Sequence, residues 1–203
     1  MNDINIDKNA LRRSIAAKIK ALSSEERLLE SQKVMATVEN LPEFQAAHTV
    51  MCYHSMPNEV CTHDAIARWS KNKTIVLPRV IGDDLMLLEY SPEKLETGKY
   101  GIFEPALDCR QVDLDEIDLI IVPGVGFDAE CNRMGHGKGY YDRLLSEKGR
   151  IKLIGVAFEC QIVDSVPHCS HDIGMDKVIT ASNIYRSKYE TDKILRNNAD
   201  SKL

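Results

Sequence analysis

The chain has 203 residues, 43% of them hydrophobic and 28% charged, and its formal net charge at pH 7 is -5. This composition is close to that of an average globular domain, which excludes disordered, collagen-like and other low-complexity proteins. The modest negative charge also argues against a protein that grips nucleic-acid phosphates over a broad surface, although it leaves room for a local basic pocket. We therefore expect one globular domain and no nucleic-acid partner.

Six cysteines are spread along the chain without a CxxC pair, and no secretory apolar segment precedes them. This spacing is typical of reduced thiols, so we expect a cytoplasmic protein. The longest apolar run, around residues 119–122, is far shorter than the roughly 20 residues that a membrane span needs. We therefore expect no membrane partner.

Two amphipathic helices are predicted at the start of the chain. The first, over residues 8–22, is indicated by apolar residues at spacings of three and four, namely Leu11, Ile15, Ile19 and Leu22. Ser23 and Glu26 then have the spacing of a capping box, and an apolar pattern continues up to Pro42. The second helix is therefore expected to begin directly after Ser23.

Short apolar runs bounded by Pro, Gly, Asn or Asp then predict strands. These runs are residues 49–53, 74–77, 85–90, 117–122 and 153–158. Helices are predicted at residues 63–71 and 140–148, so strands alternate with helices in part. Such alternation favours an α/β fold, a single three-layer α/β/α domain with a mixed, largely parallel sheet. Residues 85–105 are more typical of a hairpin-rich insertion, which is why we expect a mixed sheet.

The domain is expected to span residues 1–190. The last residues, 191–203, are rich in Lys, Asp, Asn, Arg and Ser, and we expect them to form a disordered tail.

The most informative stretch is residues 119–143, with the sequence LIIVPGVGFDAECNRMGHGKGYYDR. It begins as a buried strand and becomes glycine-rich at the strand's carboxyl end, where open α/β sheets bind their ligands. Glycine occupies every second position from Gly135 through Gly137 to Gly139. Since glycine has no side chain, its backbone N–H groups can approach an anion closely, so this segment favours phosphate binding.

Charged residues around these glycines strengthen that interpretation. Arg133 and Lys138 add positive charge, and a helix that begins near Tyr140 would direct its positive end at the same anion. Asp142 follows, where it could hold a hard cation that bridges phosphate oxygens. The spacing is neither that of a Walker loop nor that of a dinucleotide-binding fingerprint. The alternative is a flexible turn whose glycines only allow tight packing.

These motifs resemble the signature of the 5-formyltetrahydrofolate cyclo-ligase family. The matching segments are KNALR at 8–12, SMPNEV at 55–60, PGVGFD at 123–128, NRMGHGKGYYD at 132–142 and VAFECQIVDSVP at 156–167, followed by His171 and Asp172. The glycine segment is specific, whereas the other segments are weak one by one. Together they cover nearly the whole chain in the family's order and approximate spacing.

The resemblance implies an enzyme that uses ATP and magnesium to convert 5-formyltetrahydrofolate into 5,10-methenyltetrahydrofolate, with ADP and phosphate as products. ATP phosphorylates the formyl oxygen, which is a poor leaving group by itself, and the 10-nitrogen then attacks the activated carbon. Catalysis of phosphoryl transfer consists mainly of positioning and charge neutralisation. The implied partners are therefore two small molecules, and we expect a monomer.

The same resemblance implies roles for individual residues. Arg133 and Lys138 would be the catalytic cations. ATP would be bound by Lys8, Arg12, Arg133, Met134, Gly135, His136, Gly137, Lys138, Gly139, Tyr140 and Tyr141. Folate would be bound by His54, Glu59, His136, Gly137, Lys138, Gly139 and Tyr140. Magnesium would be held by Asp142 and Asp172.

One residue departs from the family's pattern, because many members carry arginine at the position of His136. Histidine titrates near pH 6.5 when unperturbed, so its charge would depend on pH, whereas that of arginine would not. We hypothesise that phosphate affinity weakens as pH rises through this range.

Several alternatives stay open at the level of sequence. Lys8 and Arg12 could be the solvated face of a helix. His168, Cys169 and His171 could bind zinc, but a second ligand pair at finger spacing is missing, so magnesium at Asp172 is favoured. The whole chain could also be a sugar-phosphate isomerase, which would need no ATP, or a binding module for RNA or protein.

Overall fold

A computed structural model of the chain describes residues 2–147, 149, 151–169 and 172–188. Its centre is a seven-stranded sheet with the order β12-β11-β9-β6-β1-β2-β3. The strands of this sheet are β1 (Thr49–Met51), β2 (Thr74–Ile81), β3 (Asp84–Glu89), β6 (Leu119–Val122), β9 (Lys152–Val156), β11 (Lys177–Ile179) and β12 (Ile184–Arg186). Neighbouring strands from β11 to β2 are parallel, whereas β3 and β12 pair antiparallel at the two edges. The prediction of a mixed, largely parallel sheet is confirmed.

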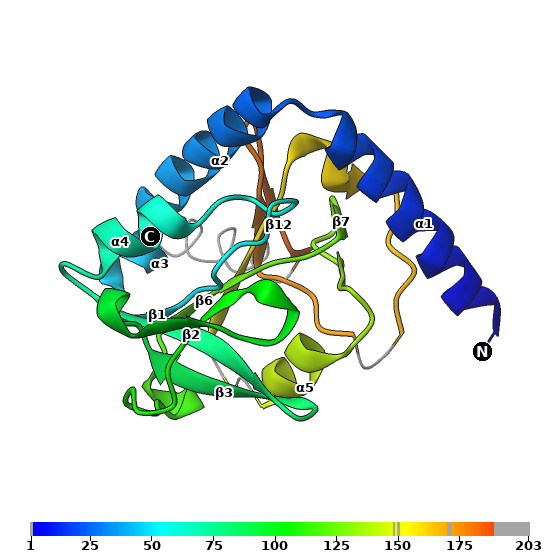
Figure 1. Ribbon diagram of the computed structural model, residues 1–203. Helices are drawn as coiled ribbons and strands as arrows, with labels where there is room; N and C mark the ends of the chain where they lie inside the picture. Colours follow the sequence, from blue (N-terminus) through cyan, green and yellow to red (C-terminus); the bar gives the residue numbers. More distant parts are fainter. Residues whose placement is uncertain (1, 148, 150, 170–171, 189–203) are drawn as a thin grey trace, which may run out of the picture.

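Helices cover both faces of this sheet (Figure 1). The α-helices are α1 (Asn2–Ala21), α2 (Ser24–Glu39), α3 (Pro42–Ala46), α4 (His63–Trp69) and α5 (Tyr140–Ser146). Short 3₁₀ helices are η1 (Pro92–Lys94), η2 (Lys99–Gly101), η3 (Leu114–Glu116) and η4 (Glu159–Gln161). Residues from α1 to α4 form one hydrophobic core with the sheet, and Leu145 of α5 belongs to a second core on the other face. The domain therefore has the three layers that were predicted.

Strand β6 shows why the sheet must be covered on both sides. All four of its side chains are buried, with Leu119 and Ile121 in the core under α1 to α4 and Ile120 and Val122 in the core with α5. Successive side chains of a strand point to opposite faces, so a continuous apolar run fits a strand with a helical layer on each side.

The predicted elements are present, with shifted ends. The first helix begins at Asn2 rather than at Lys8, and the strand predicted from Ile117 begins at Leu119, since Ile117 follows the turn of η3. The capping box is confirmed, because the Ser23 hydroxyl accepts a hydrogen bond from the Glu26 amide and the Glu26 carboxylate accepts one from the Ser23 amide. The tail prediction for residues 191–203 lies outside the described residues.

The insertion over residues 85–105 is built from hairpins, as predicted. Strand β3 pairs antiparallel with β2, and β4 (Leu95–Thr97) pairs antiparallel with β5 (Phe103–Pro105). The tip of this second hairpin, residues 98–102, lies near the site described below.

A three-stranded sheet, the second of two small sheets, was not predicted. It consists of β7 (Gly126–Asp128), β8 (Arg133–Met134) and β10 (Ile162–Val163), in the order β10-β7-β8. The buried carboxylate of Asp128 accepts hydrogen bonds from the amides of Glu130, Asn132 and Val166. This carboxylate ties the β7–β8 turn to the segment after β10, and so fixes the start of the glycine-rich loop.

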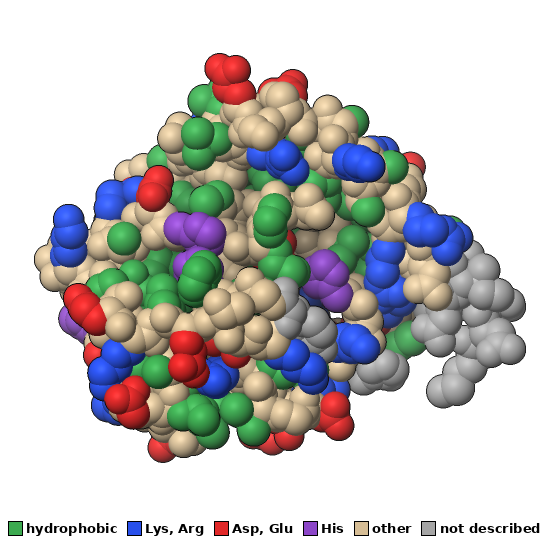
Figure 2. Space-filling model, viewed as in Figure 1, with side chains coloured by type: hydrophobic (Ala, Val, Ile, Leu, Met, Phe, Trp, Pro, Cys, Tyr) green, Lys and Arg blue, Asp and Glu red, His purple; other side chains and the backbone are tan. Residues whose placement is uncertain are grey.

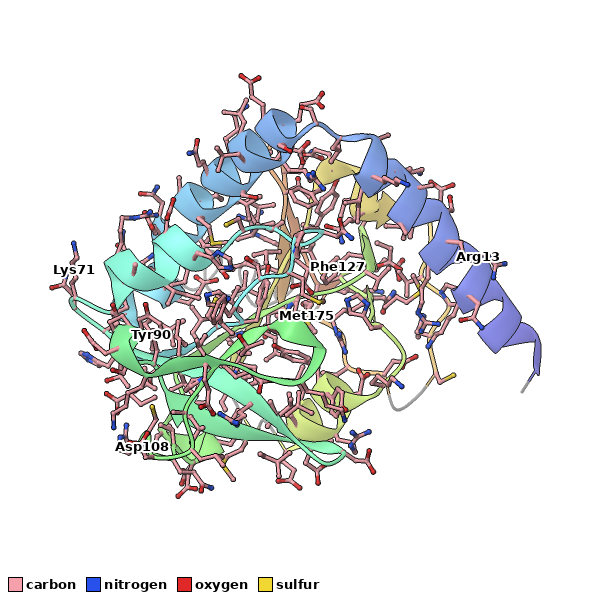
Figure 3. The ribbon with its side chains drawn as sticks, in the orientation of Figure 1. Arg13, Lys71, Tyr90, Asp108, Phe127 and Met175 are labelled. Carbon is pink, nitrogen blue, oxygen red and sulfur yellow. The ribbon has the colours of Figure 1, made fainter. Side chains whose placement is uncertain are left out.

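Phe127 of β7 anchors the small sheet on the main one. It is fully buried beside Met175 in the interior of the molecule (Figure 3). Gly155 of β9 makes room for both side chains, because a Cβ atom at Gly155 would lie 2.7 Å from the Phe127 ring and 3.1 Å from Cγ of Met175.

We expect Gly155→Ala to lower the free energy of unfolding by about 1–3 kcal/mol, the usual cost of overpacking a core. Urea denaturation would measure this loss. Gly174→Ala is the matched control, since the nearest atom to its added Cβ would be the Cys131 carbonyl oxygen at an ordinary 3.5 Å. Equal stability of the two variants would contradict the packing argument.

Within the described residues, no helix has both the length and the apolar character to cross a bilayer. All six cysteines are free thiols.

Candidate functional site

Helix α1 carries two cations that contact distant segments of the chain, one of which is the glycine-rich loop. The Arg12 Nε donates a hydrogen bond to the Gly135 carbonyl oxygen at 3.0 Å, and the Lys8 Nζ lies 2.6 Å from Oδ2 of Asp172. Lys8 and Arg12 are four residues apart, so they lie on one face of the helix. The alternative that both residues are a solvated surface is wrong, since each is partly buried against a distant segment.

Arg133 lies at the centre of the site and is only 5% exposed. One guanidinium nitrogen lies 2.7 Å from Oδ1 of Asp142, and another donates to the Pro123 carbonyl oxygen at 3.3 Å. The Tyr141 ring faces the same guanidinium, with its centroid 5.7 Å away. The Nε of Arg133 is buried and has no hydrogen-bond partner among the described residues. A buried donor without a partner is costly, so a ligand that accepts this hydrogen bond would be favoured.

Arginines pack directly on the glycines of the loop. A Cβ atom at Gly135 would lie 2.9 Å from Arg133, and one at Gly137 would lie 3.3 Å from Arg12. Gly137 also has a φ of +92°, a conformation that residues with a side chain rarely adopt. The glycines therefore allow guanidinium groups to lie against the loop backbone, in addition to the anion approach that the spacing predicts.

The other loop residues have different environments. Lys138 and His136 are exposed, and the carbonyl oxygen of Lys138 accepts a hydrogen bond from Arg143. Tyr140 is half-buried beneath the Arg143 guanidinium, which lies 5.4 Å from its ring centroid. The Met134 side chain is buried in the core, so any nucleotide contact of this residue is limited to its backbone. Lysine and arginine side chains gather on the side of the molecule that α1 covers (Figure 2).

Each carboxylate assigned to magnesium by resemblance is paired with a cation. Asp142 pairs with Arg133 and Asp172 pairs with Lys8, and Asp172 also accepts a hydrogen bond from the Cys169 amide. Across the described part of the chain, no cluster of three or more His, Cys, Asp or Glu side chains could hold a metal ion. The zinc alternative depends partly on His171, which lies outside the described residues.

A cavity of about 510 Å³ lies beside the loop, between the start of α2 and the tip of the β4–β5 hairpin. Its lining residues are Ser24, Arg27, Leu28, Ser31, His54, Ser55, Met56, Pro57, Glu59, Cys61, His63, Gly101, Ile102 and Phe103. Histidine and hydrophobic side chains gather below α2 on this face (Figure 2). Both predicted folate residues outside the loop, His54 and Glu59, therefore face one cavity.

Glu59 connects this cavity to the loop. One carboxylate oxygen accepts a hydrogen bond from the Met56 amide at 2.9 Å, and the other lies 3.6 Å from Nε2 of His136. The Glu59 side chain is only 10% exposed. The Tyr141 hydroxyl is also buried nearby without a partner among the described residues, and burial, followed by the charge of Glu59, raises the pKa of this tyrosine.

His54 stacks on His63 in the cavity wall, with ring centroids 3.9 Å apart. Burial, and then the neighbouring His63, lowers the pKa of His54 from 6.5 to about 4. His54 is therefore neutral near pH 7 and presents a flat ring rather than a charge to the cavity.

This shift has a consequence for stability. Between pH 6.5 and about 4, the unfolded chain binds a proton at His54 while the folded chain does not, so the free energy of unfolding falls as pH falls. We expect His54→Gln to weaken this pH dependence, as measured by urea denaturation from pH 4 to 7. The exposed His48, changed in His48→Gln, serves as the control; parallel curves for wild type and His54→Gln would contradict the prediction.

Several cavity residues were not singled out from the sequence. Arg27, Leu28 and Phe103 belong to an ordinary helix and a hairpin tip, and only the packing of these elements brings them to one cavity. His63 was interpreted solely as the start of a helix. No local pattern distinguishes these residues from surface residues.

The fold and the site define an α/β protein in which a cationic glycine loop adjoins a cavity of small-molecule size. The chain belongs to the 5-formyltetrahydrofolate cyclo-ligase family, whose sequence model matches residues 4–181. The resemblance seen in the motifs is thereby confirmed, and the alternatives of a sugar-phosphate isomerase or a binding module are wrong.

Relatives and solved structures agree with this assignment. The chain is 31% identical to a probable 5-formyltetrahydrofolate cyclo-ligase of Schizosaccharomyces pombe, over 91% of this chain and 100% of the relative. It is 32% identical to the 5-formyltetrahydrofolate cyclo-ligase of Escherichia coli K12, over 82% of this chain and 96% of the relative. Its fold is similar to that in the NMR structure of Aquifex aeolicus 5,10-methenyltetrahydrofolate synthetase, with a TM-score of 0.81 and 37% sequence identity. The match covers 89% of this chain and 93% of the Aquifex aeolicus chain.

Proposed function

We propose that this chain catalyses the ATP- and magnesium-dependent cyclisation of 5-formyltetrahydrofolate to 5,10-methenyltetrahydrofolate, with release of ADP and phosphate. The observation that carries the proposal is the two-part site. A loop that lies against Arg12 and Arg133 suits polyphosphate, and the adjoining cavity suits a flat organic molecule. The contact between His136 and Glu59 joins the two parts, so a phosphoryl donor and its acceptor could meet there.

In the first step, the formyl oxygen of the folate attacks the terminal phosphorus of ATP and ADP departs. The 10-nitrogen then attacks the activated carbon and loses its proton to solvent, and the C–O bond breaks as phosphate leaves. Arg133 is suited to neutralise the charge that develops on the transferred group, because its buried guanidinium is held by Asp142 and its Nε has no partner among the residues that the structure describes. Lys8, Arg12 and Lys138 would bind the remaining phosphates.

Two carboxylates are candidates to hold a magnesium ion. Asp142 and Asp172 would hold it, since magnesium commonly takes one or two carboxylates together with substrate phosphates and water. The bound ion would neutralise phosphate charge. Both carboxylates are paired with cations that would themselves be drawn to ATP, so phosphate binding and release of the carboxylates would be coupled.

The folate would lie in the cavity. Glu59 presents a carboxylate oxygen toward the loop end of the cavity, where it could accept hydrogen bonds from the N–H groups of the reduced pterin. The neutral His54 ring would line the same pocket.

His136 remains a distinguishing feature of this chain. It is exposed and lies between the loop and Glu59, so a charged imidazole there would attract phosphate. His136→Arg places a permanent positive charge at this position, so we expect it to bind ATP at least as tightly as the wild type at pH 7. Weaker ATP binding by this variant, measured by calorimetry, would exclude this role.

The test of the function is direct. Purified protein is incubated with 5-formyltetrahydrofolate and MgATP, and the absorbance of the methenyl product is followed. Product that forms only when ATP and magnesium are both present would support the proposal, whereas ATP-independent turnover or no product would refute it. The monomeric state and the cytoplasmic location stay predictions, for which sedimentation and cell fractionation are the measurements.

A further inference from the structure

Arg143 lies in α5, just after the glycine-rich loop, and its guanidinium makes contacts on two sides. Toward the loop, one terminal nitrogen donates a hydrogen bond to the Lys138 carbonyl oxygen at 3.1 Å. Toward the turn between β2 and β3, the other terminal nitrogen donates to the Asp83 carbonyl oxygen, and Nε lies 3.4 Å from Oδ1 of Asp84. One planar group therefore bridges the carboxyl end of the loop and a turn of the main sheet.

Packing also holds this guanidinium in place. It lies over the Tyr140 ring, 5.4 Å from the ring centroid. A Cβ atom at Gly139 would lie 2.8 Å from the same nitrogen that donates to Lys138, so the guanidinium occupies space that a side chain at this position would need. Gly139 also has a φ of +72°, which glycine adopts without strain. Glycine at position 139 thus lets Arg143 lie directly against the loop backbone.

The hydrogen bond to Lys138 determines where the next amide points. The peptide that joins Lys138 to Gly139 is trans, and in a planar trans peptide the C=O and N–H bonds point in opposite directions. Because Arg143 holds the carbonyl oxygen on its own side, the N–H of Gly139 points away from Arg143.

The loop amides have donors available for a ligand. The amides of residues 136–139 donate no hydrogen bond to any residue that the structure describes. At the other end of this run, Arg12 Nε donates to the Gly135 carbonyl oxygen at 3.0 Å, so the orientation of the His136 amide is set in the same way. An arginine therefore holds the backbone at each end of four consecutive unused donors.

We propose that Arg143 is a positioning residue for phosphate binding. By holding the Lys138 carbonyl against the β2–β3 turn, it keeps the Gly139 amide directed toward the phosphates of ATP. Glycine loses more conformational freedom on ordering than any other residue, so a loop that is ordered in advance binds its ligand more tightly. This inference rests on the proposed function, and it adds a residue that acts through the loop backbone.

The first test compares the two substrates. Arg143→Ala is expected to weaken binding of ATP, measured by calorimetry with excess magnesium, by about 10-fold. Affinity for 5-formyltetrahydrofolate should stay within about twofold of that of the wild type, because Arg143 does not line the cavity. In turnover, KM for ATP should rise while KM for the folate is unchanged. Equal losses for both substrates would indicate general damage to the fold and overturn the inference.

Arg143→Lys separates positioning from charge. Lysine keeps the positive charge, but its single nitrogen cannot reproduce the fork that bridges Lys138 and Asp83. We expect this variant to bind ATP more weakly than the wild type, by at least about threefold. ATP affinity equal to that of the wild type would show that Arg143 acts through its charge alone, which would also overturn the inference.

A spectroscopic measurement examines the amide itself. In the ¹H–¹⁵N spectrum of the wild type, the Gly139 resonance should move when MgATP is added, since its N–H then donates to phosphate. In Arg143→Ala the movement at saturating MgATP should be much smaller. Movements of equal size in the two proteins would show that the Gly139 amide is directed without Arg143.

Arg68→Ala is the matched control. Arg68 is 53% exposed, close to the 47% of Arg143, and it also pairs with a carboxylate, that of Glu39 on α2. This variant removes the same charge away from the loop, so its affinity for ATP should stay within about twofold of that of the wild type.

The outcomes separate this inference from the function on which it rests. Methenyl product from the wild type, together with unchanged ATP affinity in Arg143→Ala, would overturn only the inference. A wild type that neither binds MgATP nor forms product would overturn both. Loss of ATP affinity in both Arg143 variants, with folate affinity retained, is the result we expect.

Discussion

Arg133→Ala is expected to lower kcat by about 10³-fold or more, the range found when an arginine that stabilises phosphoryl transfer is removed. The physical reason is the position of this guanidinium, which is held between Asp142 and the Pro123 carbonyl. Its Nε is buried and finds no hydrogen-bond partner in the described part of the chain. Water could not take over the role of this guanidinium without a large loss of transition-state stabilisation, because Arg133 lies almost fully inside the protein. The methenyl absorbance assay at saturating MgATP measures the effect.

Two further variants make the result interpretable. Arg13→Ala removes the arginine that follows Arg12 in α1 and lies on the outer side of the helix (Figure 3). The kcat of this variant should equal that of the wild type. Arg133→Lys keeps the charge but loses the planar fork, so we expect a folded protein with much reduced turnover. Circular dichroism would show that the variants fold, since breaking a buried ion pair can cost about 3–5 kcal/mol. Full activity of folded Arg133→Ala would show that the phosphate site lies elsewhere.

The second large effect is expected for Asp142→Asn. If Asp142 holds magnesium, the concentration of magnesium needed for half-maximal turnover should rise at least tenfold, since loss of even an outer-shell partner costs about 10- to 100-fold in metal affinity. Asparagine still offers an oxygen to Arg133, so the variant separates metal binding from the positioning of that side chain. A titration of turnover against magnesium at fixed ATP is the measurement.

The alternative outcome for Asp142 is equally clear. If its carboxylate only positions Arg133, then Asp142→Asn would lower kcat by the same factor at every magnesium concentration. Asp84→Asn is the control, because Asp84 is 80% exposed, pairs with Arg143 at 3.4 Å and is not assigned to the metal. Its magnesium requirement should match that of the wild type.

Local physical chemistry made the elements of this fold predictable. The capping box at Ser23, the apolar run of β6 and the hairpins after residue 85 each depend on residues close together in the chain. The glycine-rich loop was predictable for the same reason, because its glycines and cations are within ten positions of one another. Element ends were less accurate, since tertiary packing rather than local propensity determines where a helix or strand stops.

The roles that the family's motifs imply depend on residues that are distant from one another in the chain. The structure pairs Lys8 with Asp172 and Arg133 with Asp142, and it places Arg12 and Arg133 against the glycine-rich loop, yet which of these residues contacts ATP or magnesium stays a prediction. The pairing of each carboxylate with a cation was not foreseen.

The sequence by itself determined the fold class, the family and the position of the glycine-rich loop, since these depend on local patterns and recognisable motifs. Only the tertiary structure decided which distant residues meet. Lys8 contacts Asp172 across 164 positions, and α2 faces a hairpin tip about which no local pattern gives information. The reason is that helices and strands are chosen by neighbours in the chain, whereas a cavity is formed by surfaces that pack together only after those elements exist.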